Sequence, residues 1–186
     1  GHVGFYDGAT PLCANVNVVG GTASCTVSDF IVGTHAITAR YGGDDDTGAA
    51  VSFALAQQVR ALPTTTSVDT ACSRTFTANQ PFTLRATIAT ASLGGTPGGS
   101  VDFVADTGAT LCHAVALAGG AASCTTTDIA VPAGQGQATV AIGARYSGDA
   151  INAGGSSPDL TVTVFNPADV MLRNGFEPAT PGCPAR

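Results

Sequence analysis

Apolar and polar residues alternate with a period of two along most of the chain. Apolar residues that share one face recur in short runs: Val3 and Phe5; Ile37, Ala39 and Tyr41; Val51, Phe53 and Leu55; Val101 and Phe103; Val140, Ile142, Ala144 and Tyr146; Leu160, Val162 and Val164. Successive side chains of a strand point to opposite faces, so this pattern predicts strands that are buried on one face only. Glycine-rich turns separate the runs. The sequence therefore predicts an all-β protein of packed antiparallel sheets, a sandwich rather than a barrel.

One structural unit is written twice in the chain. The string LCANVNVVGGTASC at residues 12–25 returns as LCHAVALAGGAASC at residues 111–124. In both copies a G-x-V-x-F segment precedes this string and an A-R-Y-x-G-D segment follows it. The second copy also carries an insertion at residues 132–137, which a surface turn accommodates at low cost. The duplication predicts two tandem domains.

The expected domains are residues 1–60 and 63–164, followed by a C-terminal strand or clasp at 165–186. In the second domain two further strands, at 64–69 and 82–88, precede the strand that contains Val101. The first domain has no counterpart of these strands, because its first residues already match the Val101 strand. We expect this sandwich to lack its N-terminal strands. Either the sequence is part of a longer protein, or another chain supplies the missing strands.

Four of the six cysteines belong to the repeated string. Each copy is predicted to form a β-hairpin with a three-residue turn that ends in glycine, so that Cys13 faces Cys25 and Cys112 faces Cys124. Directly opposed residues on such a ladder have Cα atoms about 4.5–5.5 Å apart, which suits a disulfide bond. Zinc sites bring cysteines in close C-x-x-C pairs with histidine nearby, and the sequence has no such arrangement. We therefore predict two disulfide bonds.

The two remaining cysteines are Cys72 and Cys183. A fold-back of the C-terminal tail would pair them within the chain, and the alternative is that each links to another chain. Six cysteines in a chain of this kind indicate an oxidising compartment, so we expect a secreted or cell-surface protein.

Charge excludes two classes of partner. The net charge is −6, there is no lysine, and the seven arginines do not cluster. Nucleic acids and anionic membranes both attract concentrated basic residues, so neither is an expected partner. No apolar run is long enough to cross a membrane. The expected partners are proteins, either neighbouring repeats or identical subunits.

Candidate catalytic and metal-binding residues are few. Asp44–Asp46 could offer oxygen ligands to calcium, but no spaced carboxylates complete a site, and a solvated acidic turn is the favoured interpretation. His35 has no counterpart in the second copy, and we expect it to be a surface or half-buried residue. Tyr41 and Tyr146 are expected to bury their rings and to bond their hydroxyls to the backbone at a sheet corner. We predict no enzymatic activity and no cofactor.

The ordered elements G-x-V-x-F, G-G-x-A-S-C and A-R-Y-x-G-D, present in both copies, resemble the bacterial immunoglobulin-like repeats of large secreted and surface-exposed proteins. The resemblance covers residues 1–59 as a truncated repeat and 63–164 as a whole one. It implies a seven-strand sandwich used as a stalk, spacer or adhesive segment. The cysteine pairs depart from the plainer repeats, in which apolar residues commonly stand at these positions.

Three functions follow as hypotheses. The first is a non-catalytic, disulfide-stabilised stalk or spacer of a secreted or surface protein. The second is a subunit of an extracellular fibre, in which the incomplete first sandwich accepts a strand from the next chain, with residues 169–176 as the candidate donor. Its apolar residues would be Val170, Met171, Leu172 and Phe176. The third is a carbohydrate-binding accessory module that contacts a surface glycan, which the lack of tryptophan disfavours.

Overall fold

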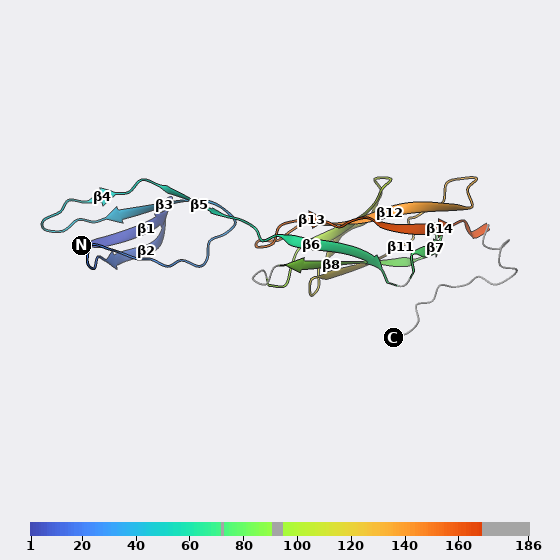
Figure 1. Cartoon of the computed structure of the whole chain (residues 1–186), viewed down its shortest axis with the longest axis horizontal. Coiled ribbons are helices and arrows are strands. Elements are labelled where there is room, and N and C mark those ends of the chain that lie inside the picture. The colour runs from blue at the N-terminus through green and yellow to red at the C-terminus, as the bar shows by residue number, and fades with distance from the viewer. Residues whose placement is uncertain (72, 91–94, 169–186) are drawn as a thin grey trace. The chain divides into compact units, whose positions relative to one another are not determined.

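The computed structural model of the chain describes residues 1–71, 73–90 and 95–168 (Figure 1). The chain divides into two units, Gly1–Ala61 and Leu62–Arg186, named unit 1 and unit 2 below. The named elements of the described residues are all β-strands, and the predicted all-β class is confirmed.

Unit 1 is a single five-stranded sheet. Its strands are β1 (His2–Asp7), β2 (Thr10–Asn17), β3 (Gly33–Tyr41), β4 (Ala50–Val51) and β5 (Leu55–Val59). The order is β2-β1-β3-β4, and β5 also pairs with β3. All pairings are antiparallel, and Phe5 in the middle of β1 lies opposite Cys13 on one side and Ala39 on the other.

Unit 2 contains two sheets. Its strands are β6 (Thr64–Thr70), β7 (Thr75–Thr77), β8 (Phe82–Thr90), β9 (Ser100–Ala105), β10 (Thr110–Ala116), β11 (Ala121–Thr126), β12 (Gln137–Tyr146), β13 (Gly155–Ser156) and β14 (Leu160–Phe165). Six strands form one sheet in the order β10-β9-β12-β14-β7, with β13 also paired to β12. The other three form a sheet in the order β11-β8-β6. These two layers make the predicted sandwich.

The core of unit 2 lies between its two sheets. The largest fully buried side chains come from β8, β9, β12 and β14: Leu84, Val101, Phe103, Ile142, Val162 and Val164. Each stands at an alternating apolar position, as the sequence predicts. Complete burial of such a side chain stabilises the fold by about 1.5–3 kcal/mol.

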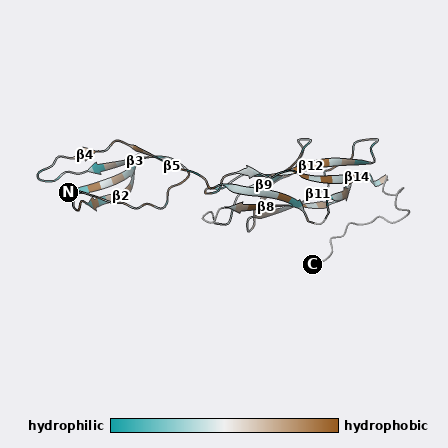
Figure 2. Cartoon of the chain, in the orientation of Figure 1, coloured by the Kyte–Doolittle hydropathy of each residue, from teal (hydrophilic) through white to brown (hydrophobic). Residues whose placement is uncertain are grey.

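The matching face of unit 1 is only partly covered. Its apolar residues Val3, Phe5, Ile37, Ala39 and Leu55, together called the open face, have the same registers as their counterparts in unit 2. None of them is fully buried. The hydropathy colouring in Figure 2 shows hydrophobic segments along the strands of both units, so composition is not the cause of this difference. The cause is that the second sheet exists only in unit 2.

The predicted burial of the Val51, Phe53 and Leu55 run is wrong. These side chains are 66%, 100% and 63% exposed. Strand β4 ends at Val51, so Phe53 lies between two strands, and Leu55 faces solvent because no second layer covers it. In unit 2 the counterpart of Leu55 is Leu160, which is only 4% exposed.

The turn inside the repeated string differs from the predicted three-residue loop. Residue pairs Val19↔Thr22 and Ala118↔Ala121 close two-residue turns in the two units. Their central residues are Gly20 and Gly21 in unit 1 and Gly119 and Gly120 in unit 2, all with positive φ between 59° and 82°. A two-residue turn that needs positive φ at both positions favours the Gly-Gly dipeptide.

Unit 2 has more strands than the expected seven. The additional ones are short. Strand β7 pairs in parallel with β14, with Phe76 opposite Val164, and β13 pairs with the end of β12. A three-residue and a two-residue strand are too short to produce an alternating pattern in the sequence.

Candidate functional site: the disulfide bonds and the open face of unit 1

Two disulfide bonds connect the four cysteines of the repeated string, in the pairs that the sequence predicts. Cys13 bonds to Cys25 in unit 1, with their Cα atoms 6.2 Å apart, and Cys112 bonds to Cys124 in unit 2, with a Cα separation of 6.5 Å. Both separations lie within the range that a disulfide bond spans.

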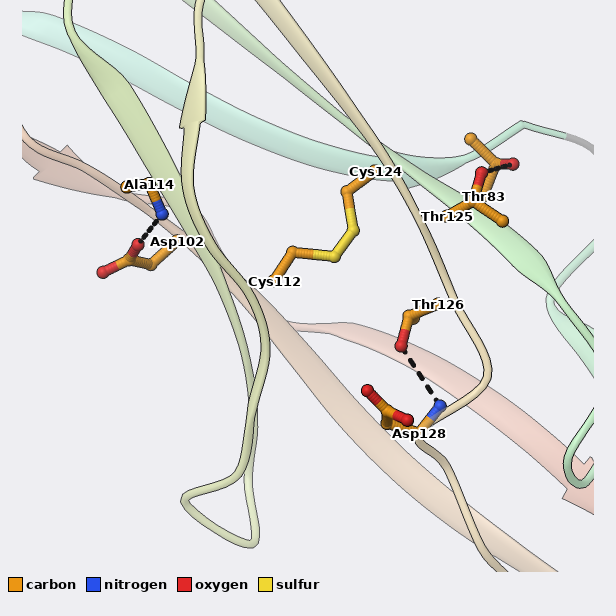
Figure 3. Close-up of a disulfide and its surroundings, with 8 residues drawn as sticks. All are labelled: Thr83, Asp102, Cys112, Ala114, Cys124, Thr125, Thr126 and Asp128. Atoms are coloured by element: carbon orange, nitrogen blue, oxygen red, sulfur yellow. Dashed lines mark hydrogen bonds between the residues drawn. A yellow bond between two sulfur atoms is a disulfide. The ribbon is translucent and has the colours of Figure 1, made fainter.

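The predicted placement of these bonds across one hairpin ladder is wrong. Cys112 lies on β10, which pairs with β9 in the six-stranded sheet, whereas Cys124 lies on β11, which pairs with β8 in the other sheet. Beyond the tight turn the two strands diverge into different layers, because each carries an apolar face that must lie against the core. Figure 3 shows the bond crossing between the two ribbons. In unit 2 the bond therefore ties the two sheets together.

In unit 1 the bond holds a segment that has no sheet to join. Cys25 stands where Cys124 stands in unit 2, but residues 23–32 form no strand. Among the backbone hydrogen bonds of the described residues, none involves residues 23–30. The segment lacks a partner because unit 1 has no counterpart of β8. The disulfide bond to Cys13 on β2 still fixes its position.

Several predicted site residues lie outside the described residues. They are Cys72 and Cys183, for which an intrachain disulfide bond is predicted, and the candidate donor residues Val170, Met171, Leu172 and Phe176. The disulfide bond and the donor strand both stay predictions.

His35 forms an ion pair that the sequence analysis missed. It is buried, with 8% of its surface exposed, and its Nδ1 lies 2.6 Å from Oδ2 of Asp7. Its Nε2 donates to the carbonyl oxygen of Ile31 at 2.9 Å. Because both ring nitrogens face acceptors, the charged imidazolium is favoured, and the bond to Asp7 followed by that to Ile31 raises the pKa of His35. The bond from His35 lowers the pKa of Asp7.

His35 in β3 thus links Asp7 at the end of β1 to Ile31 in the loop before β3. Oδ1 of Asp7 also accepts the backbone N–H of Ala36 at 3.0 Å. The alternating pattern contained a signal for this site, since His35 shares a face with Ile37 and Ala39 and so points inward. A histidine at an inward position of a strand needs a polar partner, and Asp7 continues the inward positions of β1.

Unit 2 conserves the carboxylate of this site but not the histidine. By strand register the counterpart of Asp7 is Ala105, but the next residue, Asp106, supplies a carboxylate whose Oδ2 accepts the backbone N–H of Ala141 at 3.2 Å. Val140 replaces His35 and is buried. Here the surface forms a shallow cavity of about 390 Å³ lined by Asp106, Val140 and residues of the loop that carries the insertion, among them Pro132.

A tyrosine and an aspartate three residues later form a turn in both units. In unit 2, Tyr146 donates its hydroxyl to Oδ2 of Asp149 at 3.2 Å. Asp149 also accepts the backbone N–H groups of Gly98, Ile151 and Asn152, each at 2.8 Å. Donors around the carboxylate, the side chain of Asn152 first, hold the pKa of Asp149 well below its usual range, and burial raises the pKa of Tyr146.

In unit 1 the hydroxyl of Tyr41 donates to Asp44. The prediction that these hydroxyls bond to backbone is therefore wrong, because a carboxylate at the turn is the stronger acceptor. The bond from Tyr41 lowers the pKa of Asp44, and the carboxylate raises the pKa of Tyr41. Asp44 also accepts the backbone N–H of Asp46 at 3.2 Å, so within the acidic turn it serves as a structural acceptor.

The part of the chain that the structure describes contains no group of three or more His, Cys, Asp or Glu residues placed to hold a metal ion. Within the same residues, no helix combines the length and the apolar character that crossing a membrane requires.

The family model described as bacterial Ig-like domain (group 3) matches residues 1–60 and 69–165. No curated protein matches the chain. The first matched segment lies within unit 1 and the second within unit 2.

Proposed function

The chain belongs to the bacterial Ig-like domain family, and we propose that it serves as a stalk or spacer segment of a secreted or cell-surface protein. The proposed role is mechanical and non-catalytic. The chain would hold a neighbouring domain at a distance and resist proteases and force.

The observation that carries this proposal is the bond between the layers of unit 2. The covalent bond Cys112–Cys124 keeps β10 and β11, which belong to different sheets, joined even when the hydrogen bonds of the sandwich have broken. Lysine is absent from the chain, so reinforcement by a lysine isopeptide bond is not available to it.

The proposed location follows from the same bonds. Disulfide bonds persist in oxidising surroundings and are reduced in most cytosolic ones, so a protein that depends on them works outside the cytoplasm. Neighbouring repeats of the same kind are the proposed partners.

Single-molecule force spectroscopy of the whole chain tests the stalk proposal. The bond in unit 2 closes a loop of sequence separation 12 and spans 6.5 Å between the Cα atoms, so reduction should lengthen the extension released when this unit unfolds by about 35 Å, at 3.3–3.6 Å per residue. The double variant Cys112→Ser, Cys124→Ser is the control and should show the longer extension under both conditions. A chain that extends without a resolved unfolding event in oxidising buffer would contradict a load-bearing role.

A second candidate function is assembly into a fibre by strand complementation. The open face of unit 1 favours it, since its apolar residues are covered only in part and Leu55 is exposed, so strands from another chain can pack there. Electron microscopy and SDS-resistant ladders in gels test this candidate. Filaments made of the chain alone would support it, and a monomer at all concentrations would contradict it.

A further inference from the structure

We propose that residues 169–176 dock on unit 2 of their own chain, in the cavity beside Asp106, where Arg173 pairs with the carboxylate and the apolar residues before it cover the apolar lining. The segment is the one named above as a candidate donor strand. This docking gives it a place within its own chain, independently of the stalk role.

The cavity beside Asp106 combines an apolar lining with one carboxylate. Its apolar residues are Ala130, Pro132, Ala138 and Val140. Pro132 belongs to the insertion that only the second copy of the repeat carries. The volume of about 390 Å³ lies near the lower end of the range for binding cavities, which suits a few side chains of a peptide segment.

Beside this cavity, none of the described strands pairs with the edge of β12. Ala141 directs its C=O and its N–H toward Asp106, with donor–acceptor distances of 2.8 and 3.2 Å. Thr139 directs its own backbone groups to the same edge, because these groups alternate between the two edges of a strand. Pairing of β12 with β9 begins only at Ile142 and Ala105, so β9 does not reach Thr139. An extended segment in the cavity can bond these groups.

Unit 1 indicates which charge the carboxylate of Asp106 takes. There Asp7 accepts the backbone N–H of Ala36, at the matching position of β3, and its other oxygen bonds to His35. Val140 replaces His35 in unit 2, and no ion pair among the described residues includes Asp106. A carboxylate with a backbone donor and no cation attracts a positively charged group.

The segment that follows β14 carries the matching side chains. Residues 169–176 read DVMLRNGF, with three apolar residues directly before Arg173. Val170 and Leu172 share one face of an extended segment, so both can cover the apolar lining. Arg173 then follows on the other face, and its long side chain can pair with Asp106, which is exposed.

The described part of the chain ends within reach of the cavity. Asn166 donates its backbone N–H to the carbonyl oxygen of Gly136 at 2.9 Å, in the loop that lines one side of the cavity. A segment on the far side of β12 lies two strand spacings from β14, about 10 Å. The five residues from Ala168 to Arg173 span up to about 17 Å when extended. The segment is therefore long enough to place Arg173 beside the cavity.

Hydrogen exchange of the Thr139 amide, followed by NMR in the whole chain, tests the docking. Val170→Asp with Leu172→Asp puts charges where apolar contacts are proposed, so it should speed this exchange at least about tenfold. The matched control is Ala179→Asp with Pro181→Asp, which makes the same change beyond the docking segment. It should leave the exchange rate within about twofold of the parent chain.

A charge exchange tests the proposed ion pair. Arg173→Asp and Asp106→Arg should each speed exchange of the Thr139 amide at least about threefold, and the double variant should restore the parent rate within about twofold because it brings back opposite charges. The control double variant is Arg173→Asp with Asp159→Arg. Asp159 is another exposed aspartate of unit 2, and its replacement should restore nothing.

The outcomes separate this docking from the fibre candidate. Protection of Thr139 that survives about a hundredfold dilution, falls in the apolar variant and returns in the charge exchange supports the docking. An unprotected Thr139 amide in the parent chain, or an exchange rate that no variant changes, overturns it. Failure of the charge exchange alone overturns the pairing of Arg173 with Asp106. Protection lost on dilution overturns docking within the chain, since the segment then binds another copy, as the fibre candidate requires.

Discussion

Unit 1 and unit 2 carry the same repeated string and the same strand registers, yet only unit 2 has a core. Phe103 has no exposed surface, while its counterpart Phe5 is half-buried, and Leu160 is 4% exposed where Leu55 is 63% exposed. The difference is the β11-β8-β6 sheet. An alternating pattern therefore specifies a strand and the direction of its side chains, but burial depends on a second layer.

Local structure survives without that layer. The Gly-Gly turn, the disulfide bond and the bond between tyrosine and aspartate occur in both units. The strand equivalent to β11 does not, because its pairing partner lies far away in sequence. The comparison separates interactions between near neighbours from those between distant segments.

The largest difference between the units is expected in the free energy of unfolding that each loses when its matched phenylalanine is replaced. Phe103→Ala should destabilise unit 2 by about 3–5 kcal/mol, because it leaves a cavity in a packed core. Phe5→Ala should destabilise unit 1 by less than about half as much, since its ring is already partly in water. Urea unfolding followed by NMR signals of each unit measures both values. Equal losses would show that the open face is covered in solution.

Loss of the disulfide bond comes next. Cys112→Ser with Cys124→Ser should cost unit 2 about 2–4 kcal/mol, because the unfolded chain gains conformational freedom. Cys13→Ser with Cys25→Ser should instead release the segment around residue 25 and leave the sheet of unit 1 largely intact. Urea unfolding gives the first value, and hydrogen exchange within β1 and β3 checks the second. Collapse of the unit 1 sheet would contradict this account.

A smaller difference between the units is expected when the aspartate of each turn is replaced. Asp149→Ala removes the acceptor of several backbone N–H groups and should lower the melting temperature of unit 2 by several degrees, more than Asp44→Ala lowers that of unit 1. The folded pKa of Asp149 is lowered from 3.8, so its stabilisation is present above that pH and is lost as the pH falls through the folded pKa. Melting curves across an acid pH series test both statements.

The smallest expected effect concerns His35, which only unit 1 has. Its pKa is raised from 6.5 in the folded chain. Its contribution to the stability of unit 1 is therefore complete below pH 6.5 and is lost as the pH rises through the pKa of the folded state. The pKa of Asp7 is lowered from 3.8, so its contribution is present above that pH. The ion pair should therefore stabilise unit 1 most between these two values.

His35→Val gives unit 1 the residue that unit 2 has at this position, Val140. It should remove the pH dependence that the ion pair gives to the stability of unit 1, while the pH dependence of unit 2 stays unchanged. Melting of both units between pH 5 and pH 9, a range of about two units either side of the ordinary histidine pKa, provides the measurement. A variant whose unit 1 melts with the unchanged pH profile would show that the ion pair does not form in solution.

The amount predicted from the sequence differs between these features. The alternation of apolar and polar residues was sufficient to predict the strands that contain Phe5, Phe103 and Ile142. The repeated string was sufficient to predict which cysteines pair. The pair between His35 and Asp7 was predictable in principle, since both stand at inward positions, but nothing in the spacing brings the two together. The parallel strand β7 has only three residues, too few for any pattern.

The sequence by itself determined the all-β class, the duplication, the family and which cysteines bond. Only the tertiary structure decided that Cys112 and Cys124 join two sheets, and that one copy has a core while the other has an open face. The physical reason is that alternation and turn chemistry act between neighbouring residues, whereas layer assignment and burial depend on which distant strands pack together.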